Sequence, residues 1–261
     1  MNLTGMVRLS IVLAVLAGAV FCLSASMVKT TDFTPKRAVV VELFTSEGCS
    51  SCPPADELLS HLGQDLAAKN VQVIPLGFHV DYWNSLGWKD RFSSADFSRR
   101  QEEYARSLGV DGPYTPQMIV DGSVEFVGSS ASQANREITR AASELAMAEV
   151  SVSASGPDSL GIHVKAPAAD NGNVMLAITE DNLTTHVGSG ENNGHTLHHA
   201  AVVREFRQLG QLHDGSFDTN VPIKLQAGWK PADLKAVVFV QEGPMGKIQG
   251  AASIPLAGQA R

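Results

Sequence analysis

Cysteine is scarce in this sequence of 261 residues, which contains only three. Cys22 lies near the N-terminus, and Cys49 and Cys52 form a single C-x-x-C motif. A zinc site would need two more good ligands, and no second C-x-x-C supplies them. The sequence therefore predicts no metal site and no cofactor, with metal binding at the motif kept as a minor alternative.

Positive charge and long apolar runs are lacking as well. The chain has 20 Lys and Arg against 27 Asp and Glu, which gives a formal net charge of −7. This acidic balance argues against nucleic acid and anionic membrane surfaces as partners. The apolar run Ile11–Leu23 is too short to span a bilayer comfortably.

The N-terminus instead has the parts of a secretory signal peptide. Arg8 precedes the apolar run, and the small residues 24–26 follow it. We expect residues 1–26 to be a signal peptide cleaved after Ala25 or Ser26, and residues 27–37 to be a linker. An uncleaved anchor and a lipoprotein signal acylated at Cys22 are the alternatives. The protein is thus predicted to be periplasmic or secreted, without stable membrane insertion after cleavage.

The C-x-x-C motif stands between a predicted strand and a predicted helix. Residues 39–54 read VVVELFTSEGCSSCPP, a β-branched apolar run followed by a turn and two prolines. Prolines are tolerated in the first turn of a helix, so Cys49 is expected at or just before the first helical residue. The helix N-terminus favours an anion, which makes Cys49 the candidate nucleophilic thiolate and Cys52 the resolving thiol.

A structural staple is the main alternative for this pair. Without Cys22, every cysteine of the mature chain belongs to the motif, in a compartment where disulfides persist. However, the loop-entropy relation gives so short a ring only about 2 kcal/mol, which is little for a large domain. Redox chemistry is therefore the preferred interpretation.

The remainder of the first half alternates strands and helices. Residues 71–80 form a predicted strand parallel to the first, and residues 96–108 a helix that ends at Gly109. Asp121-Gly122 joins two further strands in a hairpin, and residues 132–147 form a helix.

The segment after the second strand is rich in aromatic and polar residues. Its members His79, Asp81 and Trp83 are candidates for a substrate groove, although Trp83 could simply cover the end of the sheet.

This order, with C-x-x-C at the first helix and Thr115-Pro116 before the third strand, resembles thioredoxin-like proteins over about residues 38–148. The resemblance implies that Pro116 is a cis-proline and that the Thr115 backbone pairs with the substrate. It also implies that Glu42 is a buried acid that takes the proton of Cys52. The alternatives are an ordinary trans proline and a Glu42 carboxylate that is only hydrogen-bonded at a strand end.

From residue 149 the pattern changes to short alternating strands separated by turns. About seven such strands within residues 149–256 predict an antiparallel β-sandwich-like domain packed on the first. The predicted fold class is therefore an α/β thioredoxin-like domain followed by an antiparallel β-sandwich-like domain. Several histidines of this half invite a metal or copper-handling interpretation, which we keep as an alternative: His186, His195, His198, His199 and His213.

Four longer motifs extend the resemblance over nearly all of the mature chain: ELFTSEGCSSCPPAD, FHVDYWNSLGWKD, YTPQMIVDG and GENNGHTLHHAAVVRE. They are similar to the secreted thioredoxin-like bacterial proteins grouped as domain-of-unknown-function family 1223, a name that implies no reaction. The chemistry favours an exported thiol–disulfide oxidoreductase acting on protein or small-molecule disulfides or on a redox partner. The alternative is a non-catalytic binding or copper-handling protein. The direction of exchange is left open.

Overall fold

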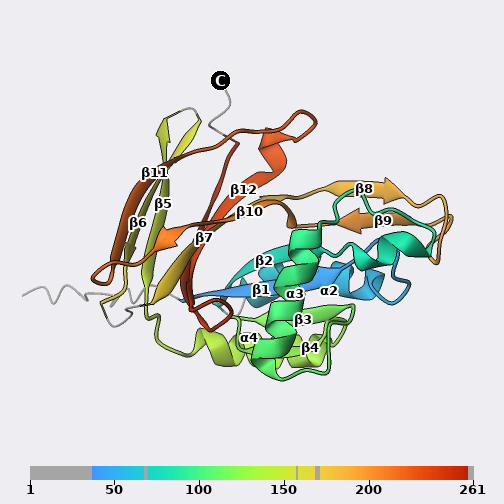
Figure 1. Ribbon diagram of the computed structural model, residues 1–261, viewed down its shortest axis with the longest axis horizontal. Helices are drawn as coiled ribbons and strands as arrows, with labels where there is room; N and C mark the ends of the chain where they lie inside the picture. Colours follow the sequence, from blue (N-terminus) through green and yellow to red (C-terminus); the bar gives the residue numbers. More distant parts are fainter. Residues whose placement is uncertain (1–36, 68–69, 157, 168–170, 258–261) are drawn as a thin grey trace, which may run out of the picture. The chain divides into compact units, whose positions relative to one another are not determined.

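An eight-stranded mixed sheet combines strands from both halves of the sequence, in the order β13-β12-β7-β10-β2-β1-β3-β4 (Figure 1). The structure is a computed structural model that describes residues 37–67, 70–156, 158–167 and 171–257. The strands from the first half are β1 (Ala38–Thr45), β2 (Gln72–His79), β3 (Gln117–Val120) and β4 (Val124–Val127). Those from the second half are β7 (Gly172–Glu180), β10 (Val202–Gln211), β12 (Leu234–Glu242) and β13 (Ile248–Pro255).

Local signals place the helices close to where the sequence predicts them. They are α2 (Pro53–Ala67), α3 (Ala95–Leu108) and α4 (Ala131–Ala142). The Ser94 side chain accepts a hydrogen bond at the start of α3, and Gly109 ends that helix with a φ of 69°. Asp121 and Gly122 both have positive φ in the tight turn between β3 and β4, as a hairpin of this type requires.

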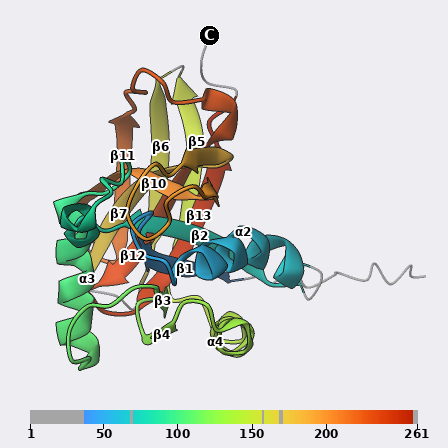
Figure 2. The same cartoon turned by 90° about the vertical axis from the view of Figure 1, so that its right-hand side faces the viewer.

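The two faces of β1 bury different partners, because side chains alternate along a strand. Val41 and Leu43 pack with α2 and α4 on one face. Val40 and Phe44 pack on the other face with Tyr104 of α3. Figure 2 shows α2 and α4 on one side of this part of the sheet and α3 on the other.

The predicted fold class, an α/β thioredoxin-like domain followed by a β-sandwich-like domain, is wrong. Four strands of the second half continue the sheet of the first, since β10 pairs with β2 in parallel where Val202 faces Gly77. Gly77 also donates a backbone hydrogen bond to the Ala201 carbonyl at 2.8 Å. An unpaired β2 edge would be a template for pairing, and β10 takes that place.

The cores of the two halves are also continuous. Phe78 from β2 packs in one buried cluster with Val203 from β10 and with Phe239 from β12. The Phe78 and Phe206 ring centroids lie 5.2 Å apart. A single apolar core therefore crosses the boundary at which the sequence pattern changes.

Only part of the second half forms a separate layer. A three-stranded sheet has the order β11-β6-β5, from β5 (Glu149–Gly156), β6 (Ser159–Lys165) and β11 (Ser216–Pro222). The hairpin of β8 (Leu183–His186) and β9 (Thr196–His199) projects separately, and two 3-10 turns, η1 (Tyr82–Leu86) and η2 (Pro231–Asp233), complete the elements.

Within the part of the chain that the structure describes, no helix has the length and apolar character needed to cross a membrane. The predicted signal peptide, residues 1–26, and nearly all of the predicted linker lie outside the described residues.

Candidate active site

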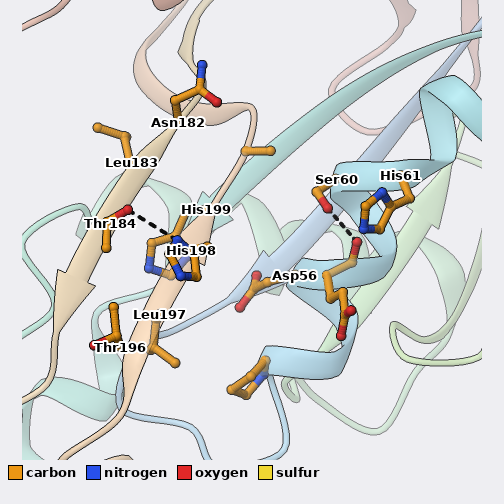
Figure 3. Close-up of a pocket in the computed structure, with 13 residues that line it drawn as sticks. Asp56, Ser60, His61, Asn182, Leu183, Thr184, Thr196, Leu197, His198 and His199 are labelled. Carbon is orange, nitrogen blue, oxygen red and sulfur yellow. Dashed lines mark hydrogen bonds between the residues drawn. The ribbon is translucent and has the colours of Figure 1, made fainter.

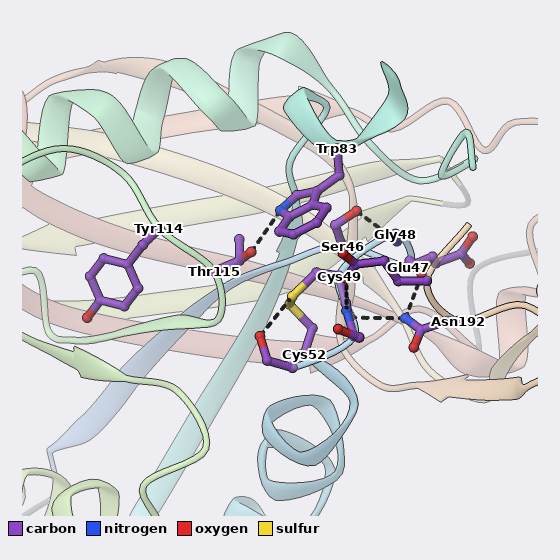
Figure 4. Close-up of a disulfide and its surroundings, with 12 residues drawn as sticks. Ser46, Glu47, Gly48, Cys49, Cys52, Trp83, Tyr114, Thr115 and Asn192 are labelled. Carbon is purple, nitrogen blue, oxygen red and sulfur yellow. Dashed lines mark hydrogen bonds between the residues drawn. A yellow bond between two sulfur atoms is a disulfide. The ribbon is translucent and has the colours of Figure 1, made fainter. Parts of the chain in front are cut away.

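Cys49 and Cys52 form a disulfide where β1 passes into α2 (Figure 4). The helix begins at Pro53, so Cys52 directly precedes it and Cys49 lies in the turn before, slightly earlier than expected. The Cys49 amide bonds to the Ser46 carbonyl at 3.2 Å, and the Cys52 amide bonds to the Cys49 carbonyl at 3.2 Å. The Ser51 hydroxyl lies 3.4 Å from the Cys49 sulfur, where it can donate to a thiolate.

Side chains from three distant segments cover the disulfide. Both cysteines are fully buried. On one side, Trp83 of η1 donates a 2.8 Å hydrogen bond to the Thr115 hydroxyl, close to Cys49 (Figure 4). The peptide bond from Thr115 to Pro116 is cis, which confirms what the resemblance implies.

On the other side, the loop between β8 and β9 holds the cysteine turn. The Asn192 side-chain amide donates to the carbonyls of Glu47 at 2.9 Å and Cys49 at 3.0 Å. The Glu191 carboxylate accepts from the Ser50 amide at 3.1 Å. Thiol–disulfide exchange requires an accessible sulfur, so this cover has to open before a partner can react.

Replacing Asn192 with alanine is expected to accelerate reduction of the disulfide by a small thiol about thirtyfold, since two hydrogen bonds are lost and each weakens the closed state by about 1 kcal/mol. Stopped-flow reduction by dithiothreitol measures the rate. The exposed neighbour Asn193 provides the control, because Asn193→Ala keeps both bonds. Equal rates for the two variants would show that the loop does not limit access.

Five buried ionisable side chains lie beneath this turn: Glu47, Asp56, His79, Asp90 and His199. We call them the acid–histidine network. His79 Nδ1 lies 2.6 Å from Asp90 Oδ2, which also accepts from the Glu47 amide at 2.9 Å. His199 Nε2 lies 3.3 Å from Glu47 Oε1, and the His79 and His199 rings meet edge to face at 4.9 Å between centroids.

Two carboxyl groups of the network have pKa values that shift in opposite directions. Burial raises the pKa of Asp56, and the positive potential of His79 and His199 offsets this only in part. Burial also favours protonation of Glu47, but its contacts with His199, Thr185 and Trp88 outweigh that effect and lower its pKa. Paired groups of this kind separate a proton donor from a base within one site.

The His79–Asp90 pair makes stability depend on pH. Burial disfavours the imidazolium, yet the Asp90 carboxylate more than compensates and raises the pKa of His79 above 6.5. Burial similarly opposes ionisation of Asp90, but His79 and backbone amides lower its pKa. The raised His79 pKa contributes stability below about pH 6.5 that is lost as pH rises through the folded value, whereas the Asp90 contribution is lost in acid.

The Asp90→Asn variant is therefore expected to have a lower free energy of unfolding than the native protein. This difference should be larger at about pH 6 than at about pH 9. Urea titrations followed by tryptophan fluorescence at both pH values measure this difference. A difference that is the same at both values would mean that His79 is uncharged in the folded protein.

Glu42 does not reach the cysteines, so the general-base role predicted for it is not supported. Its side chain lies on the α3 face of β1, opposite the face packed against α2. Arg100 Nε lies 2.6 Å from Glu42 Oε2, and the Tyr104 hydroxyl donates to Oε1 at 2.6 Å. Because side chains alternate along a strand, counting back from Cys49 through a turn that is one residue longer selects a position on the opposite face.

The other predicted site residues divide into two groups. Trp83 and Thr115 lie beside the disulfide (Figure 4), Pro116 follows Thr115 through the cis bond, and His79 belongs to the network below. Asp81, which precedes η1, instead accepts a 2.5 Å hydrogen bond from Ser98 of α3. The structure thus gives Asp81 a structural contact away from the cysteines.

Several residues at the site have no sequence signal that identifies their roles: Glu47, Asp56, Asp90, Asn192 and His199. They come from three segments far apart in the chain, and only the fold assembles them. The GENNGHTLHH motif that contains Asn192 and His199 is distinctive, but its spacing does not indicate that it contacts the cysteine turn.

Among the described residues, no group of three or more His, Cys, Asp or Glu side chains is arranged to hold a metal ion.

Comparison with known proteins agrees with the whole-chain resemblance. A family model described as "Protein of unknown function (DUF1223)" matches residues 40–241. A crystal structure of protein AGR_C_4864 from Agrobacterium tumefaciens is similar, with 29% sequence identity, a TM-score of 0.67, and coverage of 85% of this chain and 96% of that one. A domain of the outer membrane lipoprotein Omp28 from Porphyromonas gingivalis matches at 8% identity and a TM-score of 0.25, over 43% of this chain and 90% of that one, too weakly to support any inference. No curated protein matches.

Proposed function

The chain belongs to the family described as protein of unknown function (DUF1223), so its function has to be inferred from its own site, and we propose that it is an exported thiol–disulfide oxidoreductase. The observation that carries this proposal is the position of the Cys49–Cys52 disulfide above the acid–histidine network. Burying several charged groups is costly, and a disulfide that served only as a staple would not need them.

Exchange with a substrate disulfide proceeds in two steps. The Cys49 thiolate attacks one substrate sulfur, which forms a mixed disulfide and releases a substrate thiolate. The Cys52 thiolate then attacks the Cys49 sulfur, which releases the second substrate thiol and restores the disulfide. The substrate gains two electrons and two protons, and a dithiol partner supplies them when it reduces Cys49–Cys52 again. The reverse sequence oxidises a substrate dithiol.

Asp56 replaces Glu42 as the group that exchanges a proton with Cys52. It stands four residues after Cys52, and its backbone amide donates to the Cys52 carbonyl at 3.1 Å. Side chains so spaced at the start of a helix lie one above the other. Burial raises the Asp56 pKa, which makes this carboxyl group a better proton acceptor than an exposed aspartate.

The predicted signal peptide supports a periplasmic or extracellular location, where the substrates would be exported protein thiols or small disulfides. A chain with net charge −7 suits partners other than nucleic acid.

Full burial of both cysteines favours one competing function, a binding protein whose disulfide is structural.

An exchange assay separates the two functions. A catalytic amount of the oxidised protein is incubated with a fluorescent model dithiol and an excess of glutathione disulfide. Oxidation of the dithiol is then followed in time. Catalysed turnover above the uncatalysed rate supports the proposal. Transfer of no electrons, with the Cys49–Cys52 bond intact by mass spectrometry, would favour the binding protein.

A further inference from the structure

A second feature of the molecule is a cavity of about 650 Å³ between α2 and the β8–β9 hairpin (Figure 3). Its volume lies within the range of small-molecule sites in proteins. The helix contributes Asp56, Ser60 and His61, and the hairpin contributes Thr196 and His198. The cavity therefore shares Asp56 and His199 with the acid–histidine network.

The lining contains two acidic residues, Asp56 and Glu57, together with three histidines and no Lys or Arg; the histidines are His61, His198 and His199. The Asp56 side chain points from α2 toward the hairpin (Figure 3), and the residue is only 8% exposed. Burying a carboxylate this deeply is unfavourable, and His79 and His199 compensate for the cost only in part.

The other lining groups restrict what that partner can be. Leu183 and Leu197 give the hairpin side apolar surface, while the Thr196 hydroxyl and the Ser60 hydroxyl can accept hydrogen bonds. The Ser60 hydroxyl donates to the Glu57 carbonyl, which leaves its lone pairs to accept. A ligand with a donor-rich cationic head and a short apolar chain matches both kinds of surface.

A metal ion and an anion fit less well. The described residues contain no cluster of three or more His, Cys, Asp or Glu side chains with metal-binding geometry. An anion would meet two acidic groups and no basic side chain other than histidine. Neutral polyols could form hydrogen bonds here but would add no positive charge to the partial compensation that His79 and His199 give Asp56.

We propose that this cavity is a binding site for a primary alkylammonium compound, whose ammonium group is held by Asp56 with the surrounding hydroxyls and whose chain lies against Leu183 and Leu197. An ammonium group supplies three donors and a compact positive charge, which are the features that a deeply buried carboxylate requires. The site shares Asp56 with the proposed proton exchange at Cys52, but ligand binding to the oxidised protein is measured without any exchange reaction.

The test uses three five-carbon probes that differ only in their ends: 1,5-diaminopentane, 1,5-pentanediol and glutarate. Isothermal titration calorimetry with the oxidised full chain is expected to show that the diamine binds one to one and that the other two do not. Equal binding of the diol or of glutarate, or binding of none of the three, would overturn the proposal.

Two variants locate the site. Asp56→Asn is expected to weaken diamine binding by about tenfold or more, because a charged hydrogen bond is lost. Thr196→Phe fills the cavity from its exposed rim, leaves the carboxylate in place, and is expected to abolish binding. Asp65→Asn on the exposed side of the same helix is the control and should bind as the native protein does. Unchanged affinity in the Thr196→Phe variant would place the diamine elsewhere.

Discussion

Replacing Cys49 with serine is expected to reduce catalysed thiol–disulfide exchange to the uncatalysed rate. A hydroxyl cannot act as the attacking thiolate, and the single remaining cysteine cannot form the internal disulfide. The exchange assay with a model dithiol measures this loss directly. Activity that persisted in Cys49→Ser would assign nucleophilic attack to another group and contradict the mechanism.

The matched control is Cys52→Ser, which also removes the internal disulfide but keeps the nucleophile. This variant is expected to accumulate a mixed disulfide between Cys49 and the substrate, visible as an added mass, because no resolving thiol remains. Cys49→Ser should accumulate none. If the two variants behaved alike, loss of the disulfide itself, rather than loss of the nucleophile, would explain the missing turnover.

Replacing Arg100 with methionine is expected to lower the free energy of unfolding by about 3–5 kcal/mol, because it leaves Glu42 as a buried charge without its partner. Arg100 also donates to Gln241 Oε1 at 3.1 Å, and its guanidinium carbon lies 4.7 Å from the Phe206 ring centroid. The ion pair thus lies where β1, α3 and the second half of the chain meet. Urea unfolding of the oxidised protein measures the change.

The double variant Glu42→Leu with Arg100→Met tests that explanation, since removing both charges is expected to restore most of the lost stability. Glu42→Gln should retain exchange activity, because Glu42 faces Arg100 and not Cys52. Loss of exchange in a stably folded Glu42→Gln variant would return the general-base role to Glu42.

Local sequence patterns predict most of the individual elements but not how they assemble. The apolar run before Cys49, the prolines after Cys52 and the Asp121-Gly122 turn each determine conformation over a few residues. The pairing of β10 with β2 depends on Gly77 and Val202, which are far apart in the chain and carry no shared pattern. The separate sandwich was therefore predicted in place of a continuous sheet.

The candidate site divides in the same way. Cys49, Cys52 and Thr115 belong to contiguous motifs, and the structure places them together (Figure 4). Glu42 illustrates the limit of such reasoning, because a strand position found by counting back from Cys49 changes face with one extra residue in the turn. The network of Glu47 with His199 joins residues from the two halves, so it could be recognised only once the hairpin was seen against the cysteine turn.

The reduction potential of the Cys49–Cys52 pair is the most direct test of whether this disulfide takes part in thiol–disulfide exchange. Mature protein is equilibrated with defined thiol–disulfide buffers, and the reduced fraction is measured by thiol labelling. We expect a reversible two-electron couple between about −120 and −270 mV, the range of exchange catalysts. A pair that stays oxidised below about −300 mV would be a structural disulfide and would contradict the proposed function.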